Sequence, residues 1–453
     1  MSKWQDLEIG KAITFNPTEK LSIGQIAKKI PMDRLSVSDR KISGFEFSTY
    51  SAGPKFRNGD TLLAKITPCL ENGKTAKVDI LDDGEVAFGS SEFIVLRENE
   101  YTINDFIYYF AKSPAFRKRA ISCMEGTSGR KRVNETTLKN HTLPIPDKET
   151  QRKIANVLNS LDSKIELNNR INAELEAMAK TVYDYWFVQF DFPFDFAQGK
   201  PSAEGKPYKS SGGKMVWSEE LKREVPEGWE VGNLLCISKL EGGGTPNKAV
   251  SKYWNGDIDF YTPSDHLESV FVMKTESKIT NEGLINCSSK LFPKGTIFIT
   301  ARGTVGNVSI ASQNMAMNQS CYAFCENEPY GYCYLYYTVK SLINVLKAKS
   351  GGSVFNSIVS NDIKHTKLPI PAESLVKKYM EICEPIFSKM LINQQESQQL
   401  SSLRDWLLPM LMNGQVKVGG EATLSKSGSD KYMSKGKEMG GLMVAESEEG
   451  YGV

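Results

Sequence analysis

The stretch Leu143-Pro144-Ile145-Pro146, followed by an amphipathic segment that runs to Trp186, occurs twice in this chain. Leu368-Pro369-Ile370-Pro371 repeats the tetrapeptide, and the shift from position 143 to position 368 defines a repeat offset. Downstream of the first copy, apolar or small polar residues recur at alternating steps of four and three, which is the heptad pattern of a helix packed along a narrow seam. Most of this pattern survives at the repeat offset in the second copy. The sequence therefore predicts two long helices of common register, produced by an internal duplication.

The heptad positions name the residues expected in the helix seam. They are Ile154, Leu158, Leu161, Ile165, Asn168 and Leu175 in the first helix, and Ile386, Met390, Asn393, Leu400 and Leu407 in the second. Pro385 interrupts the second pattern, because proline removes a backbone donor and clashes with the preceding turn. We expect the second helix to kink there, or its first turn to be a separate short piece.

Composition is that of a chain with ordinary globular domains. The 453 residues are 40% hydrophobic and 24% charged, which suffices for two or three domains with their own cores. Because the formal net charge is only +2, a nucleic-acid surface must come from local basic clusters. The sequence has neither an apolar run of about 18 residues nor a signal-peptide core, so we expect no membrane association and a cytoplasmic location. Cys321, Cys325 and Cys333 lack metal-ligand spacing, and no metal site is expected.

The order of segments predicts a mixed α/β (α+β) fold with two duplicated domains, each followed by a long helix. Short apolar runs bounded by turn formers, such as Thr61–Ala64, indicate strands. A stretch rich in Gly, Ser, Lys and Pro between the two halves predicts a flexible linker, and a similar C-terminal composition predicts a disordered tail. The expected segments are a first domain at 1–142, a first helix at 143–189, the linker at 190–227, a second domain at 228–367, a second helix at 368–412 and the tail at 413–453.

Several motifs recur in the same order in both halves. Lys294-Gly295-Thr296 corresponds to Asn58-Gly59-Asp60, and Gly351-Gly352-Ser353 follows Gly126-Thr127-Ser128 at the repeat offset. Together with the tetrapeptides, the segments Ile66–Lys74, Ala301–Gly306 and Val225–Trp229 resemble those of the specificity subunits of type I restriction–modification enzymes. The resemblance covers residues 1 to about 412. Single motifs are only moderately specific, whereas their order and duplication are highly specific.

This resemblance implies a double-stranded DNA partner with a bipartite target, one half read by each domain. It also implies that the helices pack as an antiparallel coiled coil, set the spacing and dock methyltransferase subunits, and that endonuclease/translocase subunits join the complex. S-adenosylmethionine and ATP would then be bound by partner subunits, with no cofactor in this chain. In an antiparallel pair of equivalent helices, Asn168 and Asn393 should lie near each other, since both stand close to the middle of their helices.

Candidate DNA-binding residues are cations, glycines and amide or hydroxyl side chains in loops, because phosphates are bound by Lys/Arg and backbone amides and bases by paired donors and acceptors. In the first domain they are Lys65, Thr67, Asn72, Lys74, Ser128, Gly129, Arg130, Lys131 and Arg132. In the second domain they are Arg302, Gly303, Thr304, Gly352 and Ser353. Each of these loops could equally be a solvated turn with ordinary surface charge.

Catalytic motifs are lacking in the sequence. The three histidines have no nucleophile or carboxylate signature around them, and Asn16-Pro17-Thr18-Glu19 lacks the second proline and the aromatic of an adenine methyltransferase motif. We therefore expect no catalytic residues in this chain. Two alternatives stay open: a self-contained fusion of methyltransferase and recognition domains, which a cofactor-binding assay would reveal, and a helical scaffold that binds protein. A scaffold would show no salt-sensitive mobility shift with random duplex DNA.

Overall fold

The structure, a computed structural model, describes residues 4–127, 129–202, 204–267, 269–349 and 357–418. The chain forms two compact units, one comprising residues up to Val157 together with the chain from Leu407 onward, and the other comprising Leu158–Trp406. The long helices α5 (Lys148–Tyr183) and α9 (Glu373–Met412) each contribute to both units. No helix in the described parts of the chain combines the length and apolar content needed to cross a membrane.

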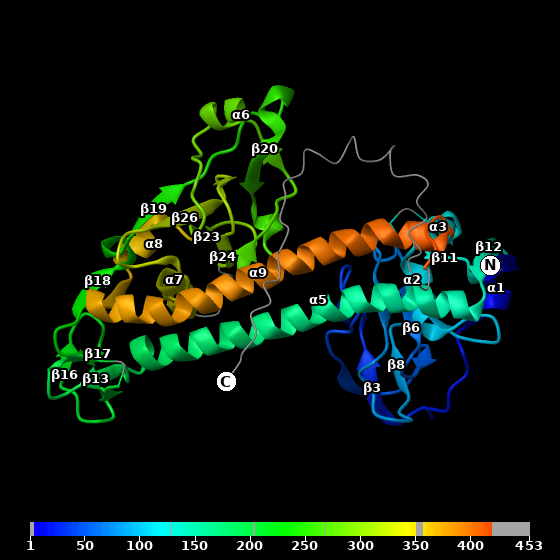
Figure 1. Cartoon of the computed structure of the whole chain (residues 1–453), viewed down its shortest axis with the longest axis horizontal. Coiled ribbons are helices and arrows are strands. Elements are labelled where there is room, and N and C mark those ends of the chain that lie inside the picture. The colour runs from blue at the N-terminus through cyan, green and yellow to red at the C-terminus, as the bar shows by residue number, and fades with distance from the viewer. Residues whose placement is uncertain (1–3, 128, 203, 268, 350–356, 419–453) are drawn as a thin grey trace, which may run out of the picture. The chain divides into compact units, whose positions relative to one another are not determined.

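The first domain is built on two four-stranded sheets (Figure 1). The first sheet has the order β2 (Thr14–Phe15), β9 (Phe93–Arg97), β6 (Thr61–Ala64), β7 (Thr75–Lys77). The second has the order β4 (Glu46–Thr49), β3 (Ile26–Ile30), β8 (Ala87–Gly89), β5 (Lys55–Phe56), with β3 and β8 parallel. Apolar side chains of both sheets, among them Phe56, Leu62 and Val95, form one buried cluster. Burial of this cluster is what holds the two sheets together.

Short helices complete the first domain: α1 (Ile9–Ala12), the 3-10 helix η1 (Met32–Arg34), α2 (Asn104–Lys112), α3 (Pro114–Ser122) and α4 (Glu135–Lys139). The chain between α2 and α3 breaks at Ser113, whose hydroxyl accepts a hydrogen bond from the Phe116 amide (3.3 Å). Pro114 occupies the first position of α3. A backbone N–H at this position has no partner inside the helix, so proline costs no hydrogen bond there. A small hairpin, β10 (Met124–Glu125) and β11 (Arg132–Val133), follows α3.

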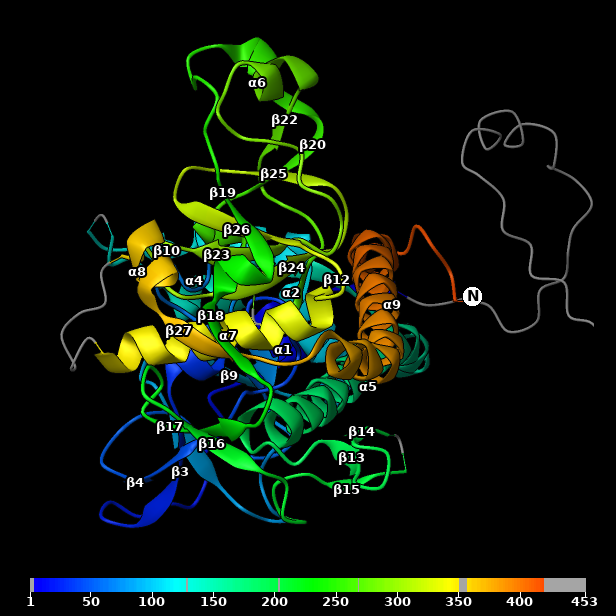
Figure 2. The ribbon, with the colours of Figure 1, turned by 90° about the vertical axis from the view of Figure 1, so that its left-hand side faces the viewer.

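The second domain also has two sheets, and the first four strands of its larger sheet follow the order seen in the first domain, but its sheets have five and three strands. Its larger sheet has the order β19 (Ser238–Gly242), β26 (Cys321–Glu326), β23 (Ile297–Thr300), β24 (Val308–Ala311), β21 (Phe271–Val272). A smaller sheet has the order β22 (Lys278–Ile279), β20 (Trp254–Tyr261), β25 (Met315–Met317), with β20 and β25 parallel. Its helices are η3 (Leu234–Cys236), η4 (Ser251–Tyr253), η5 (Pro263–Asp265), α6 (Asn281–Ile285), α7 (Tyr332–Lys349) and α8 (Ser360–His365). Figure 2 shows the smaller sheet and α6 projecting beyond the larger sheet.

The repeated tetrapeptides are strands, not the starts of the helices. β12 (Thr142–Pro146) pairs with β1 (Trp4–Glu8) so that Gln5 faces Ile145, and β27 (Lys367–Ile370) pairs with β18 (Glu230–Asn233) so that Glu230 faces Ile370. Both pairings have the same register once the repeat offset is applied. The helices expected from residues 143 and 368 therefore begin later, because each tetrapeptide first closes its domain against the domain's own N-terminal strand. Two-stranded ladders tolerate these prolines, since each strand has a free edge.

The segment between the halves is folded, which contradicts the flexible linker expected at 190–227. The π-helical turn η2 (Asp184–Val188) leads into β13 (Pro193–Asp195), β14 (Lys200–Pro201), β15 (Lys206–Pro207), β16 (Met215–Ser218) and β17 (Arg223–Pro226). The rings of Phe192 and Tyr208 are buried and stack at 4.7 Å between centroids, and Phe192 also stacks on Trp229. Glycine-rich composition misled the prediction, because those glycines occupy tight turns around an aromatic core. Gly213 is one, since a Cβ there would lie 2.5 Å from Tyr208.

In the Leu158–Trp406 unit the helices run antiparallel (Figure 1). The Asn168 side chain donates to the Asn393 carbonyl (3.3 Å), and the Asn393 side chain donates to Oδ1 of Asn172 (2.9 Å). On one side of this polar centre Arg404 pairs with Asp162 at 2.7 Å. Along the seam, residue numbers therefore increase in α5 in the direction in which they decrease in α9. The antiparallel arrangement and the proximity of Asn168 and Asn393 are both confirmed.

The predicted seam residues differ in how deeply their side chains are buried. Buried members are Ile154, Leu158, Ile165, Asn168, Met390 and Asn393, and half-buried members are Leu161, Leu175, Ile386, Leu400 and Leu407. Next to Ile386, Phe387 is fully buried and packs on rings of the second domain, including that of Tyr336 (5.9 Å). Helix α9 continues through Pro385, so the expectation of a separate first turn is wrong. Of the expected tail, residues 419–453 lie outside the described residues.

Candidate nucleic-acid interface

The candidate residues of the first domain lie in two segments that are far apart in sequence and adjacent in the structure. The turn after β6 contains Thr67, whose amide donates to the Lys131 carbonyl (3.0 Å) and whose hydroxyl accepts from the Lys131 amide (3.1 Å). The Val133 amide donates to the Lys65 carbonyl (2.9 Å). These hydrogen bonds join the turn after β6 to the segment around Lys131–Val133, so that both lie on one surface at the end of the central strand.

Two cations of this surface are available to a ligand. Arg130 and Lys131 are exposed, and within the described parts of the chain their side chains have no hydrogen-bond or ionic partner. Gly129 has a φ of +80°, a conformation that favours glycine, and open space surrounds the place of a Cβ. Asn72 is exposed in the neighbouring turn. The surface thus offers charge, approachable backbone and an amide side chain, which are the groups needed for phosphate and base contacts.

Arg132 differs from these two cations because it is held by a carboxylate. Its guanidinium bonds to both oxygens of Glu92, with Nη2 to Oε1 at 2.7 Å and Nε to Oε2 at 2.9 Å. The hydrogen bonds from Arg132 lower the pKa of Glu92, and the same bonds raise the pKa of Arg132. The three consecutive cations are therefore not equivalent. Arg132 anchors the loop, which leaves Arg130 and Lys131 to face outward.

The side chains of two further candidates, Lys74 and Lys65, make contacts within the domain that stabilise the turn. Lys74 donates to the Met32 carbonyl (3.0 Å), and Lys65 lies 3.5 Å from Oε1 of Glu135. Arg117, which belongs to a basic run in the sequence but was not among the candidate DNA-binding residues, donates to the Glu71 carbonyl (2.7 Å). Its guanidinium also covers Gly73, where an added Cβ would lie 3.2 Å from it. The signals in the sequence that could have indicated this contact are the basic run Arg117–Arg119 and a glycine two residues before a strand.

The second domain builds a corresponding turn after its central strand β23. The Ile358 amide donates to the Ala301 carbonyl (3.0 Å), and Ile358 corresponds at the repeat offset to Val133, which makes the equivalent bond in the first domain. Arg302, Gly303 and Thr304 are exposed at the tip of this turn. The structure therefore brings the predicted residues of both domains to equivalent places. Ser128, Gly352 and Ser353 lie outside the described residues.

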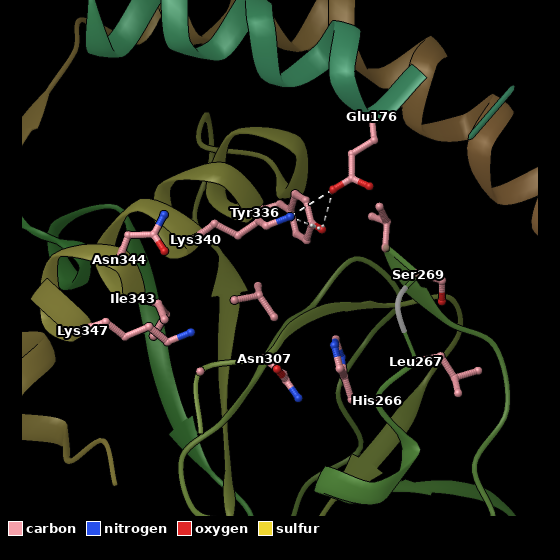
Figure 3. Close-up of a pocket in the computed structure, with 13 residues that line it drawn as sticks. Glu176, His266, Leu267, Ser269, Asn307, Tyr336, Lys340, Ile343, Asn344 and Lys347 are labelled. Carbon is pink, nitrogen blue, oxygen red and sulfur yellow. Dashed lines mark hydrogen bonds and ion pairs between the residues drawn. The ribbon is translucent and has the colours of Figure 1, made fainter. Parts of the chain in front are cut away.

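A hollow of about 300 Å³ lies beside the turn of the second domain (Figure 3). Helix α7 lines it with Tyr336, Lys340, Ile343, Asn344 and Lys347, the loop before β21 with His266, Leu267, Ser269 and Val270, the turn with Gly306, Asn307 and Val308, and α5 with Glu176. Lys340 pairs with Glu176 at 3.0 Å, and Nδ1 of His266 is 2.7 Å from the Ser309 hydroxyl. None of these lining residues was among the sequence candidates, because they come from four separate segments.

Comparison with known proteins identifies the family. The profile described as Type I restriction modification DNA specificity domain matches residues 27–177 and 226–402, one stretch in each half. The chain belongs to this family. The two matches confirm the internal duplication, and the resemblance seen in the sequence is correct.

Relatives in this family align over most of the chain. The HindI specificity subunit of Haemophilus influenzae is 26% identical over 92% of this chain and 100% of its own length. The MjaIX specificity subunit of Methanocaldococcus jannaschii is 26% identical over 70% of both chains. The crystal structure of a type I restriction–modification S subunit from M. genitalium shares the fold, with a TM-score of 0.54, 16% identity and coverage of 90% of this chain and 96% of that one.

Proposed function

We propose that this chain is the DNA specificity subunit of a type I restriction–modification complex, with each domain reading one half of a bipartite target. The observation that carries this proposal is the repeated placement of exposed loops beside the central strand of each domain, in a chain of this family. The same surface is used twice, once at Arg130 and Lys131 and once at Arg302. Two readers in one chain match a target with two halves.

In this proposal the chemistry belongs to partner subunits in the cytoplasm. Methyltransferase subunits bind S-adenosylmethionine and dock on the helices, and endonuclease/translocase subunits bind ATP. The sequence of this chain lacks an adenine methyltransferase motif and an ATP-binding loop. The chain contributes affinity and choice of sequence, and it performs no covalent step.

Methyl transfer assays test this division of labour. The purified chain should transfer no methyl groups to DNA, and neither should the methyltransferase subunit alone at a rate above background. Mixing the two should give sequence-dependent methylation. Detectable transfer by the chain alone would contradict the proposal, as would methylation by the mixture that is independent of sequence.

We further propose that the helix pair sets the distance between the half-sites. Because Asn168 and Asn393 meet across an antiparallel seam, a heptad inserted directly after Asn168 would face a heptad inserted directly before Asn393, and the two insertions together would keep the register. One heptad adds about 10 Å of helix, which corresponds to roughly three base pairs of duplex. The unspecified gap in the methylated sequence should lengthen by that amount, or binding should fail. A folded, active variant with the original gap would show that the helices do not measure the spacing.

A further inference from the structure

The second domain is attached to helix α5 through three side chains of α7 that converge on Glu176. The Tyr337 hydroxyl donates to the Glu176 carbonyl (2.9 Å). Oε1 of Glu176 accepts from the Tyr336 hydroxyl (3.3 Å) and from Nζ of Lys340 (3.0 Å). Figure 3 shows the Glu176 side chain pointing from α5 toward Tyr336 and Lys340. Both tyrosines are buried, where a hydroxyl needs a partner, so these bonds fix the place at which α7 meets α5.

A second attachment joins the same domain to helix α9. Nε2 of Gln394 donates to the Ser269 hydroxyl (3.0 Å) and to the Phe271 carbonyl (2.8 Å). The Ser269 hydroxyl in turn donates to the Phe271 carbonyl (3.1 Å). Because Phe271 is the first residue of β21, at the edge of the larger sheet, Gln394 holds the sheet itself.

The two attachments lie at different levels of the helix pair. Asn172 donates to the Met390 carbonyl (2.9 Å), and the helices are antiparallel, so Glu176 lies one turn beyond this contact, level with about Ile386. Gln394 lies about eight residues, or about 12 Å, from that level. A single attachment would let the domain rotate about it, whereas two separated attachments resist rotation as well as sliding.

Apolar contacts between the domain and the helices do not by themselves define an angle. Phe387 of α9 packs against Phe271 (6.3 Å between ring centroids) and Tyr336 (5.9 Å). The hydrophobic effect is non-directional, whereas a hydrogen bond weakens steeply as its angle departs from linear. The polar bonds at Glu176 and Gln394 therefore select one orientation among those that the apolar contacts allow.

We propose that Glu176 and Gln394 are positioning residues that hold the second domain at one angle on the helix pair, and that they set how strictly the complex requires one gap length between the half-sites. This inference rests on the proposed function, in which the helices determine the spacing. A rigid helix pair can fix a distance on DNA only if the domain that it carries cannot turn. One base pair is a step of about 3.4 Å along the duplex, so a small rotation of the domain is enough to reach a neighbouring register.

Methylation of duplexes with altered gaps tests the proposal. The complex of the full chain with its methyltransferase subunits is given duplexes that carry both mapped half-sites, separated by the natural gap or by a gap one base pair shorter or longer. The double variant Glu176→Ala with Gln394→Ala is compared with Glu174→Ala with Gln395→Ala, which removes the same two residue types at exposed positions of the same helices. Glu176→Gln keeps a side-chain oxygen as an acceptor and serves as the conservative variant.

The measured quantity is the ratio of the methylation rate with the natural gap to the rate with an altered gap. For the double variant this ratio should fall roughly five- to thirtyfold below that of the wild type, which is the loss expected from a few hydrogen bonds of ordinary strength. The exposed pair of substitutions and Glu176→Gln should stay close to the wild type. Thermal unfolding verifies folding, and if the double variant unfolds, Gln394→Ala alone decides, with a ratio roughly two- to fivefold lower.

A folded double variant that keeps the wild-type ratio would overturn the inference, and so would an equal fall of the ratio for the exposed pair. A loss of methylation that is the same at every gap would also overturn it, because the residues would then serve stability alone. These results would leave the proposed function intact. If the wild-type complex methylates all sequences and gaps alike, the proposed function itself fails, and this inference fails with it.

Discussion

The two domains share a backbone plan and fill it differently. Gly73 and Gly306 each stand two residues before the strand that follows the turn, with φ of +86° and +88°, and each lies against a cation from a helix. In the first domain the next residue, Lys74, bonds to the Met32 carbonyl, and Arg117 bonds to Glu71. In the second domain the next residue is Asn307, whose amide faces an open hollow. Duplication preserved the turn, while the side chains around it diverged.

The helix seam has two arms, one on each side of the contact between Asn168 and Asn393, and these arms show the same contrast. At the repeat offset, the pair Asp162 and Arg404 corresponds to Phe387 and Ala179. The first pair is an ion pair with side-chain exposures of 4% and 13%, whereas the second pair belongs to the apolar core of the second domain. The two arms are therefore not interchangeable, although the helices arose from one sequence.

The largest expected effect comes from breaking the polar arm of the seam. Asp162→Ala leaves the Arg404 guanidinium largely buried without its main partner, which should lower the free energy of unfolding by about 3 kcal/mol. Replacing both residues, as in Asp162→Ala with Arg404→Leu, should recover most of this loss. Urea denaturation measures both values. A single-variant loss below about 1 kcal/mol would show that the pair is not buried in solution.

The next effect compares Arg117 and Lys347, the helix cations that lie against the turn glycines Gly73 and Gly306. Arg117→Ala removes the donor to the Glu71 carbonyl and should lower the free energy of unfolding by about 1–3 kcal/mol. Lys347→Ala, at the corresponding place of the second domain, removes an exposed side chain and should change it by less than about 0.5 kcal/mol. Equal losses would indicate that both cations are structural and would weaken the contrast between a filled and an open site.

A smaller effect concerns the salt dependence of DNA binding. Arg130→Ala with Lys131→Ala should flatten the slope of log K against log salt by about two units, since two phosphate contacts are lost. Arg132→Ala should flatten it less, because Arg132 is already paired with Glu92. Binding titrations between about 50 and 200 mM salt measure the slopes. An unchanged slope in the double variant would make this loop an ordinary solvated turn.

The smallest effect is a pH dependence of the Glu92–Arg132 pair. Hydrogen bonds from Arg132 hold the pKa of Glu92 below its ordinary value of 4.5, so the pair stabilises the fold above that pH and is lost as the pH falls and the carboxyl is protonated. The stability difference between the wild type and Glu92→Gln should be constant at neutral pH and shrink in acid. A difference that grows below pH 4.5 would contradict the pairing.

The sequence predicted the duplication and the long helices well, because a heptad pattern repeated at a constant offset reports backbone periodicity directly. It also placed Asn168 against Asn393, since a pseudo-two-fold axis relates equivalent midpoints. It failed at 190–227, where buried aromatics such as Phe192 outweigh a linker-like composition. The hollow could not be predicted, because Glu176, His266 and Lys347 meet only through tertiary packing.

The most direct test of the account is a map of modified bases in a genome that expresses this chain with its methyltransferase subunit. The second domain, from β18 through β27, is replaced by the corresponding domain of a relative, while the helices and the first domain are kept. Two independent readers predict that one half of the methylated sequence changes and that the other half and the gap stay the same. A change in both halves would contradict the account.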